Sequence, residues 1–504
     1  MKTKILLSIG RQKNKQALLP AITQLPQDEV ILYGTEKTAK FLTKHDINNQ
    51  LVHKISQSNR SPNIADLLIK NQLDLIINIP TRTDHQAQDK EYTDGQYIRR
   101  KAVENNITLI TDVEVAKLYL SSLSSGRLSD SSYPSQSPPA EPFTAYYQPL
   151  YNIDKSYDFN YEFGPFFDGV LPEFKPPKKP VKLLGLKLNS RFGVPAGPLL
   201  NSRWVKTYAD LGYDLLTYKT IRTINHPCHK PPNVVFIDEQ KDYNFDPKKP
   251  AYTKNKDSNN FTDSTYPRIS ITNSFGVPSK EPDVWQEDIK QLLPQLHPGQ
   301  LLILSVMGTA QSHSSEKEFI NDFVACSVMG QEAGVKAIEV NLSCPNLGGE
   351  ALFADADLST AILKQVRQTL DSSTRLLAKL GYFPRQQQLK KFINSTHQYL
   401  EGYTAINTVP KKVVDTNGKQ ALPGESRVSS GTCGALIKEA GLSTVAGLAD
   451  HRQQKDLDYV IIGVGGVMTP NDYQTYLEAG ADAVQAATGP MWNPYLAYQI
   501  KQKY

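Results

Sequence analysis

The sequence predicts an α/β protein: a small parallel-sheet domain, Rossmann-like in pattern, followed by a larger (β/α)8 TIM barrel. The chain of 504 residues exceeds the length that one hydrophobic core usually supports, so more than one domain is expected. Short apolar runs alternate with helical patterns in two regions, residues 1–122 and 181–504, as they do in α/β folds. A stretch rich in serine and proline separates the two regions.

The first region, residues 1–122, has the pattern of a small parallel sheet. The apolar runs that we expect to form strands are KILLSI, EVILY, LDLIINI and ITLIT. Helical patterns extend from Lys13 to Leu25 and from Thr35 onward. Strands that alternate with helices in this way usually pair in parallel, so we expect a compact α/β domain here.

Residues 123–142 are expected to form a linker. They lie almost entirely within the run SSLSSGRLSDSSYPSQSPPAE, whose serine and proline content cannot bury enough apolar surface to offset the entropy of ordering the chain. Residues 143–180 are aromatic and proline-rich without a helical or strand period. We therefore expect an extended arm that packs on the domain that follows.

Residues 181–504 contain repeated units of a strand followed by a helix. The expected strands are FGVPA, YDLLTYK, LLILSVM, KAIEVN, RLLAKL, YTAINT, YVIIGVG and DAVQAAT. The intervening helices include Asn201–Leu211, Pro282–Leu293, Glu316–Ala333, Leu358–Leu370 and Pro470–Leu477. Continuous apolar runs are typical of strands buried on both faces, and eight such units match the (β/α)8 barrel. An open, doubly wound sheet of eight strands is the alternative.

The composition argues against several classes of protein. A net charge of +5, without a dense block of lysine and arginine, does not favour a nucleic-acid partner. The four cysteines are too few and too scattered for a disulfide framework or an iron–sulfur cluster, so we expect a reducing compartment and no metal. No apolar run approaches the ~20 residues that span a bilayer, and the N-terminal run is too short for a signal peptide. We therefore expect a cytoplasmic protein with no membrane partner.

Polar residues repeatedly end the apolar runs of the second region. They are Lys219, Asn341, Lys379, Asn407, Thr408 and Thr488, and the glycine pair Gly465 and Gly466 follows the seventh run. Because the carboxyl ends of barrel strands meet at one mouth, where active sites are built, we expect these residues to converge there. The glycine pair and the threonine also suit a phosphate group, since small residues let backbone N–H groups approach the anion.

Two further residues belong to this predicted site. Cys344 lies in NLSCPN, just beyond the fourth strand, where a thiol at the mouth can serve as a general base. Asn273 lies in ITNSFGVPS, in the long connection after the second strand. Several amides without a cluster of carboxylates indicate a planar ligand with both donors and acceptors at its edge. Cys326, on a predicted apolar helix face, is interpreted as structural. The roles of Cys228 and Cys433 stay open, and loop or packing roles are favoured.

The motif series NLSCPN, LLTYKT, NSFGVPS, YTAINT and GVGGVMTPNDYQTYLEAGADAVQAATG resembles that of the class 1 dihydroorotate dehydrogenases, in order and spacing. The resemblance implies an FMN-binding barrel that oxidises dihydroorotate to orotate in pyrimidine biosynthesis. Cys344 would take the proton from C5 of the substrate, and Lys219 would lie between the substrate carboxylate and the flavin. The pyrimidine would be held by Asn273, Asn341, Asn346, Asn407 and Thr408. The cofactor would be held by Ala196, Gly197, Lys219, Thr220, Lys379, Gly434, Gly465, Gly466, Ala487 and Thr488.

The sequence departs from that family in the connection between Lys219 and Asn273, which is far longer than usual and puts the substrate size and lid behaviour in doubt. The loop after the sixth strand also resembles the barrel of dihydropyrimidine dehydrogenase, so another pyrimidine is an alternative substrate. Cys344 places the chain with soluble members, for which we expect a soluble electron acceptor, either fumarate or a partner subunit. A homodimer is expected by analogy alone. A non-catalytic, nucleotide-binding regulatory protein is a further alternative.

Residues 1–122 resemble a second family, the methylglyoxal-synthase-like (MGS-like) domain that forms the regulatory end of carbamoyl phosphate synthetase. The resemblance lies in LLSIGRQKNK, YGTEKTAKFL, LVHKISQSNRSPNIADLL and LDLIINIPTR. It implies that a phosphate or nucleotide is bound by Lys13 or Lys15, together with Thr35, Thr38, Lys54 and Asn78. Our hypothesis is that the domain senses a nucleotide such as UMP. Pro62 stands where the synthase has its catalytic aspartate, so we expect binding without methylglyoxal chemistry. The alternative is a folding or dimerisation module without a ligand.

Overall fold

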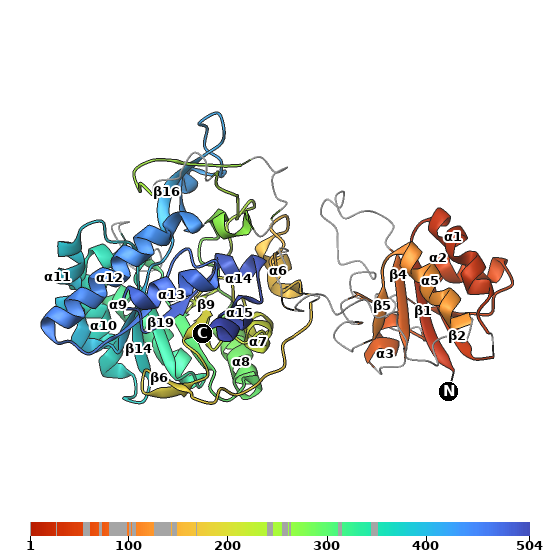
Figure 1. Cartoon of the computed structure of the whole chain (residues 1–504), viewed down its shortest axis with the longest axis horizontal. Helices are drawn as coiled ribbons and strands as arrows, with labels where there is room; N and C mark the ends of the chain where they lie inside the picture. Colours follow the sequence, from red (N-terminus) through yellow and green to blue (C-terminus); the bar gives the residue numbers. More distant parts are fainter. Residues whose placement is uncertain are drawn as a thin grey trace. The chain divides into compact units, whose positions relative to one another are not determined.

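The computed structural model describes residues 2–26, 28–53, 61–69, 73–79, 98–99, 102, 107–124, 143, 149–167, 169–238, 245–254, 261, 264–310, 315–343 and 351–504. The chain divides into two compact units, Met1–Pro138 and Pro139–Tyr504 (Figure 1). Most of the predicted linker, 125–142, lies outside the described residues.

The N-terminal unit is a five-stranded sheet with strand order β3-β2-β1-β4-β5. Every neighbouring pair is parallel, which confirms the predicted parallel-sheet domain. The strands are β1 (Thr3–Ile9), β2 (Val30–Thr35), β3 (Gln50–Val52), β4 (Leu75–Ile79) and β5 (Thr108–Ile110). The helices are α1 (Gln12–Thr23), α2 (Glu36–Lys44), α3 (Ile64–Ile69) and α5 (Val113–Ser124).

Both faces of this sheet are buried, because successive residues of a strand point to opposite sides. Ile5 and Leu7 of β1 pack in one apolar cluster with Leu18 of α1 and Phe41 of α2. Leu6, between them, packs in a second cluster on the other face. This explains why β1 reads as a continuous apolar run rather than an alternating one.

The C-terminal unit contains a closed barrel of eight strands, with neighbours paired in parallel. Its strands are β8 (Phe192–Val194), β9 (Leu215–Ile221), β12 (Leu301–Val306), β13 (Ala337–Asn341), β14 (Arg375–Leu380), β15 (Gly402–Ala405), β18 (Val460–Val464) and β19 (Ala483–Gln485). Each of the eight predicted strands is present, so the barrel is confirmed and the open sheet is wrong.

The helices surround the barrel strands (Figure 1). Five of them confirm predicted helices: α7 (Ser202–Asp210), α8 (Pro282–Leu292), α9 (Glu316–Glu332), α10 (Ala356–Thr369) and α13 (Pro470–Glu478). The remainder are α11 (Gln386–Thr396), α12 (Lys438–Lys455), α14 (Thr488–Trp492) and α15 (Leu496–Lys503). Side-chain caps mark the starts of α7, α9, α10 and α13. The Asn201 side chain accepts from Arg203 and Trp204 N–H groups, and Thr469 forms a capping box with Asp472. Among the described residues, no helix is long and apolar enough to cross a membrane.

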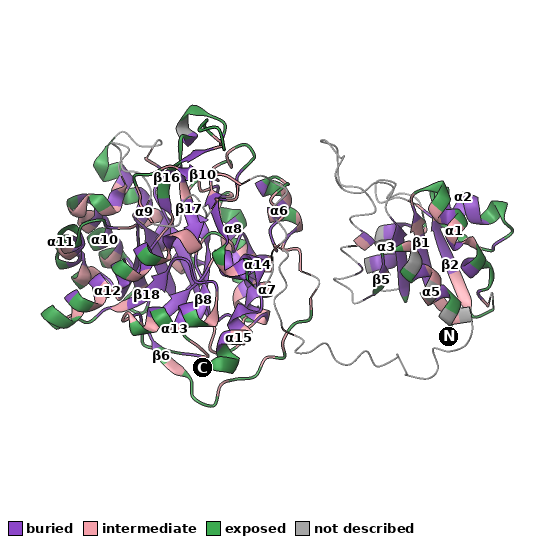
Figure 2. Cartoon of the chain, turned by 45° about the horizontal axis from the view of Figure 1, so that its top comes forward, coloured by how far each residue is buried: buried purple, intermediate pink, exposed green. Residues whose placement is uncertain are grey.

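The barrel interior has an apolar floor and a polar upper layer. The floor includes Leu215, Ile303, Ala337 and Leu377, and it packs against a hairpin of β6 (Val181–Leu183) and β7 (Leu186–Leu188). Two residues further along the strands, the side chains on the same inner face are polar and buried: Thr217, Ser305, Glu339, Lys379 and Gln485. Figure 2 shows buried strands inside and exposed faces on the outer helices. The polar layer of the barrel interior thus lies toward the carboxyl ends of the strands.

A second, four-stranded sheet has the order β10-β16-β17-β11, and the sequence did not predict it. It combines β10 (Ala251–Tyr252) and β11 (Ser270–Asn273) from the long connection with β16 (Val409–Val414) and β17 (Ser429–Gly434) from the sixth loop. Its pairings join residues far apart in the chain, as where Asn273 is opposite Gly431. Local periodicity carries no information about such pairings.

The described part of the predicted arm lies against the barrel. The Leu150 N–H donates to Met491 O at 3.0 Å, and the Asn201 amide donates to Tyr161 O at 2.7 Å. One part of this segment is a helix, α6 (Tyr157–Phe163), where an extended conformation was predicted. The Ser156 side chain caps α6 by accepting from Phe159 N–H, a local signal that the aromatic composition obscured.

At the base of the barrel, the C-terminal residue Lys501 is predicted to contribute strongly to the stability of the fold. Asp214 is fully buried and accepts from Ser190 Oγ at 2.5 Å and from Lys501 Nζ at 2.7 Å. Lys501→Met would leave this carboxylate without its counter-charge, so we expect a loss of about 1.5–3 kcal/mol in the free energy of unfolding. Unfolding by denaturant measures this change in the free energy of unfolding. Lys503→Met, an exposed neighbour on the same helix, is the control and should change stability by less than about 0.5 kcal/mol.

Candidate active site

One cavity of about 680 Å³ opens at the carboxyl ends of the barrel strands. Every barrel strand contributes to its lining through its last residues or the loop that follows, from Pro195 after β8 to Thr488 after β19. Strand β11 of the second sheet and the arm residues Tyr151 and Tyr157 complete the wall. The size is within the ordinary range for sites that enclose a small molecule or a cofactor.

The structure brings together all the described barrel residues that were predicted to form the site. They line this one cavity: Ala196, Gly197, Lys219, Thr220, Asn273, Asn341, Lys379, Asn407, Thr408, Gly434, Gly465, Gly466, Ala487 and Thr488. Cys344 and Asn346 lie outside the described residues, and the chain is described up to Ser343, which also lines the cavity. The roles of all these residues stay predictions.

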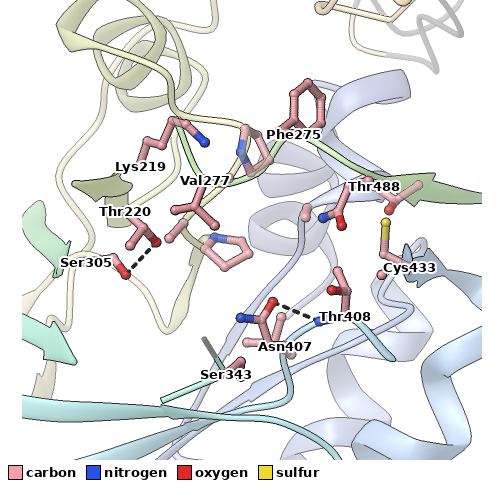
Figure 3. Close-up of a pocket in the computed structure, with 18 of the residues that line it drawn as sticks. Lys219, Thr220, Phe275, Val277, Ser305, Ser343, Asn407, Thr408, Cys433 and Thr488 are labelled. Atoms are coloured by element: carbon pink, nitrogen blue, oxygen red, sulfur yellow. Dashed lines mark hydrogen bonds between the residues drawn. The ribbon is translucent and has the colours of Figure 1, made fainter. Parts of the chain in front are cut away.

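A chain of hydrogen bonds links the amides across one side of the cavity. The Asn407 amide donates to Asn341 Oδ1 at 3.3 Å, and the Asn341 amide donates to Thr220 Oγ1 at 3.4 Å. Thr220 in turn shares a hydrogen bond of 2.9 Å with Ser305 Oγ (Figure 3). These side chains come from four different strands or strand ends, and their mutual bonds hold the amides in fixed directions.

Asn273 and Thr408 meet on another side of the cavity, beside Gly431 of β17. A Cβ atom on this glycine would lie 2.2 Å from Thr408 Oγ1 and 2.6 Å from Asn273 Oδ1. Any side chain at position 431 would therefore displace two polar groups of the site. The second sheet thus builds part of the cavity, since β11 carries Asn273 and β17 carries the glycine.

Lys219 is almost fully buried at the end of β9. Its Nζ lies 5.4 Å from the ring centre of Tyr157 and 6.0 Å from that of Phe275, so the arm and the connection after β9 both cover it. Figure 3 shows the ammonium group on the same side of the cavity as Phe275. Burial lowers the pKa of Lys219 to about 8, because removing the ammonium group from water disfavours its charged form. A lysine in this state can both bind an anion and exchange a proton near neutral pH.

Lys379, at the end of β14, is also buried, with 4% of its surface exposed. Burial lowers its pKa from the ordinary value, and the field of Glu339 opposes that effect. The sequence prediction missed Glu339, although this carboxylate also lines the cavity.

Two loops meet in the region predicted to hold a phosphate. Gly434 has φ +91° and Gly466 has φ +66°, in the left-handed region that favours glycine. A Cβ on Gly434 would lie 2.2 Å from Ile269 O, and one on Gly466 would lie 3.0 Å from Gly434 O. Only glycine therefore lets these backbones approach each other beside the cavity.

The structure assigns different environments to the described cysteines. Cys326 is buried, and its thiol donates to Ile221 O at 3.6 Å, as expected of a structural cysteine. Cys433 lines the cavity, but burial raises the pKa of its thiol to about 12, so it stays protonated at neutral pH. Among the described residues, no group of three or more His, Cys, Asp or Glu could hold a metal ion.

The long connection after β9 contributes residues that the sequence prediction did not include. Arg222, His226 and His229 line the cavity, and Arg222 donates to Val277 O at 3.1 Å and to Thr309 Oγ1 at 3.0 Å. No short motif marks these residues. Their proximity to the site follows from the fold of a connection whose unusual length was the only signal in the sequence.

In the N-terminal unit, three of the predicted anion-binding residues gather at the carboxyl edge of the sheet. Thr38 Oγ1 accepts from Ile9 N–H at 3.0 Å and from Thr35 Oγ1 at 3.4 Å, and Lys15 Nζ donates to Lys37 O at 3.0 Å. Burial, and then the charge of Lys37, lower the pKa of Lys15.

The other predicted anion-binding residues are Asn78, Lys13 and Lys54. Asn78 lies on neighbouring β4 and accepts from Arg99 at 2.7 Å, an arginine that the sequence prediction missed. Lys13 is exposed on α1, and Lys54 lies outside the described residues.

Comparison with known proteins identifies the two units. The family model for dihydroorotate dehydrogenase matches residues 262–504, and the model for the MGS-like domain matches residues 17–111. A dihydroorotate dehydrogenase of Dictyostelium discoideum is 36% identical over 359 residues, which cover 69% of this chain and 96% of that protein. The chain belongs to the dihydroorotate dehydrogenase family. Members of this family are oxidoreductases, and the predicted resemblance of both regions is confirmed.

Other relatives of this dihydroorotate dehydrogenase family member are more distant. A protein named dihydroorotate dehydrogenase B (NAD(+)), catalytic subunit, of Petrotoga mobilis is 27% identical over 234 residues, covering 46% of this chain and 70% of that protein. The solved structure of a ligand-free dihydroorotate dehydrogenase from Eimeria tenella has a TM-score of 0.51 and 17% identity, covering 66% of this chain and 89% of that chain. At that identity, the solved structure supports the barrel fold alone.

The burial of Lys219 predicts an unusual reactivity. In the ligand-free protein, labelling of this amine by a small reagent should reach half its maximum at about pH 8, because the neutral form predominates above its lowered pKa. Exposed lysines should reach that point near their ordinary value of about 10.4. Mass spectrometry after labelling over a pH series measures the profiles of Lys219 and of the exposed lysines in the same samples. A profile for Lys219 that coincides with that of the exposed lysines would contradict the burial argument.

Proposed function

We propose that the chain oxidises dihydroorotate to orotate with FMN as its cofactor and passes the electrons to a soluble acceptor. The observation that carries the proposal is the convergence of two buried lysines, several amides and a glycine-lined region in a single cavity at the barrel mouth. Membership of the dihydroorotate dehydrogenase family supports the substrate and the reaction type.

The residues that line the cavity fit the chemistry of FMN. Gly434, Gly465 and Gly466 all have positive φ, and their backbone can approach a phosphate more closely than any larger residue would permit. Ile406, Met468 and Met491 offer an apolar surface for a flat ring. Thr488, Ala487 and the glycines would hold the phosphate end, and Ala196, Gly197 and Thr220 would line the ring. FMN, when bound, supplies the acceptor for the hydride that leaves C6 of the substrate.

The amides and one lysine would hold the substrate. Asn341 and Asn407 offer both donors and acceptors in directions set by their mutual hydrogen bond, which suits the amide edges of a pyrimidine ring. Asn273 and Thr408 would complete this contact from the side of the second sheet, with Asn346 from the loop after β13. Lys219 would bind the substrate carboxylate, and the bound anion would in turn favour the charged form of this lysine.

Cys344 would take the proton from C5 of dihydroorotate as a general base. It follows β13 by three residues, in the loop that begins at the edge of the cavity with Ser343. A thiolate is a competent base when its pKa lies near the working pH. The two bonds that break are thus C5–H, whose proton goes to the sulfur, and C6–H, whose hydride leaves with both electrons.

Anaerobic reduction tests this proposal. The purified full-length protein should be yellow and should bleach when dihydroorotate is added without oxygen. Cys344→Ala should slow bleaching by about 10²–10⁴-fold, the usual contribution of a general base, and leave FMN binding unchanged. Cys326→Ala, at a buried cysteine that does not line the cavity, is the control and should keep the rate.

Three outcomes of this experiment would count against the proposal. Purified protein that binds no flavin would refute the assignment of FMN as the cofactor. Bleaching by dihydrouracil but not by dihydroorotate would favour the alternative pyrimidine substrate. An unchanged rate in Cys344→Ala would remove the assigned base. Reoxidation of the bleached protein by fumarate, and not by NAD or a quinone, is the outcome expected for the acceptor.

We infer that the MGS-like domain binds a nucleotide such as UMP. What supports this is the group formed by Lys15, Thr35 and Thr38 at the carboxyl edge of β1 and β2, next to the point where the strand order reverses between β1 and β4. Ligands of open α/β sheets bind at such a switch point. A buried lysine beside hydroxyl groups favours an anionic group there.

Calorimetry of the full-length chain with UMP, IMP and inorganic phosphate tests this inference. Binding of at least one of them is expected, and Lys15→Met should weaken it about tenfold or more, as for loss of a charge-assisted hydrogen bond of about 1.5–3 kcal/mol. Lys13→Met, on the exposed side of α1, should have a smaller effect. The absence of heat with all three ligands would leave the domain as a folding or dimerisation module.

A further inference from the structure

Glu339 is a buried carboxylate without a hydrogen-bond partner. It lies in the middle of β13, its side chain is fully shielded from solvent, and neither Oε1 nor Oε2 has a partner among the described residues. Burying a charged group in this way costs several kcal/mol unless another charge or a ligand compensates it. An uncompensated acid in a barrel interior therefore calls for a functional explanation.

The contrast with Asp214 shows that this arrangement is not general in the barrel. Asp214 is just as buried, but it accepts hydrogen bonds from Ser190 and forms an ion pair of 2.7 Å with Lys501. A carboxylate kept for structural reasons is satisfied in this manner. Glu339 has no such partner, and it lines the cavity, whereas Asp214 does not.

Lys379 is the neighbouring group of opposite charge. Asn341 of β13 pairs with Lys379 of β14, and Glu339 precedes Asn341 by two residues on the same inner face. Glu339 and Lys379 are therefore diagonal neighbours on adjacent strands. Both side chains line the cavity. Thr404 of β15, the residue paired with Lys379 on its other side, has an unpartnered hydroxyl as well.

We propose that Glu339 is a positioning residue for the reaction: its carboxylate is the counter-charge that keeps Lys379 a cation and directs the ammonium group to the cavity. The inference rests on the proposed function, because the family resemblance assigns Lys379 to the residues that would hold FMN. It assigns a task to an acid that lines the cavity and has no hydrogen-bond partner among the described residues.

The charges around the cavity indicate Glu339 as the counter-charge of Lys379. It is the one carboxylate among the described residues that line the cavity. The other titratable lining residues are cations or groups that stay neutral near pH 7: Lys219, Arg222, His226, His229, Cys433, Tyr151 and Tyr157. Burial lowers the pKa of Lys379, and the field of Glu339 acts in the opposite direction. Without Glu339, desolvation would act on this ammonium group unopposed.

Amine labelling of the ligand-free, full-length protein tests the proposal without any flavin or substrate. In Glu339→Gln, which keeps the shape and removes the charge, Lys379 should react about tenfold faster at pH 7–8, equivalent to a pKa lower by about one unit. Glu339→Asp keeps the charge, so Lys379 should be labelled almost as slowly as in the unaltered protein. Thr404→Val, a neutral change beside the same lysine, should leave the labelling of Lys379 unchanged.

A labelling profile of Lys379 in Glu339→Gln that coincides with the unaltered protein would overturn the proposal. If Glu339→Gln does not fold, the unaltered protein still provides a test, because a Lys379 that is freely reactive at pH 7 cannot be the cation we describe. Because no flavin is present, the result does not depend on whether the chain oxidises dihydroorotate.

Thermal unfolding gives a second, independent measurement. Lys379→Met alone leaves the Glu339 carboxylate buried without a counter-charge and should lower the Tm. Adding Glu339→Gln to that variant removes the unpaired charge, so the double variant should unfold at a higher temperature than Lys379→Met. Additive losses from the two substitutions would show that the residues do not act on each other.

Discussion

Closure of eight parallel strands into a barrel is the constraint on which the rest of the structure depends. A parallel strand delivers its last residue to the same end as its neighbours, so closure brings the ends of all eight strands to one mouth. Residues as far apart in the chain as Ala196 and Thr488 become parts of one cavity for this reason. The outer helices and the β6–β7 hairpin at the base make closure possible, because they cover apolar surfaces that would otherwise face water.

The polar upper layer is stabilised by the same closure. Buried amides and hydroxyls are costly unless they are paired, and here Thr220, Ser305, Asn341 and Asn407 pair with each other across strands. Burial lowers the pKa of both Lys219 and Lys379, and the charge of Glu339 opposes this effect at Lys379. Buried cations of this kind lower the stability of a fold by themselves. Their presence in a cavity is typical of a functional site.

The additions to the barrel concentrate on its mouth. The arm contributes Tyr157 over Lys219, and the long connection after β9 contributes His226 and His229, while the second sheet positions Asn273. Arg427 joins two of these additions, since its guanidinium donates to Lys230 O at 2.8 Å and to Ser274 Oγ at 2.9 Å. The barrel thus provides both lysines and the amides of Asn341 and Asn407, and the added segments complete the wall of the cavity.

The sequence by itself determined both domain types, the eight strands and the residues at their ends. Strands buried on both faces must be apolar throughout, and a polar residue that ends such a strand can be read without knowledge of its neighbours. Only the tertiary structure determined the second sheet, the helix in the arm and the place of Glu339. The pairing of β11 with β17 joins residues more than a hundred positions apart, and no local pattern encodes it. In the sequence, Glu339 is only a polar residue that interrupts an apolar strand. Its role depends on the residue that lies diagonally across from it on the adjacent strand. That neighbour is determined only when the strands pair in the closed barrel.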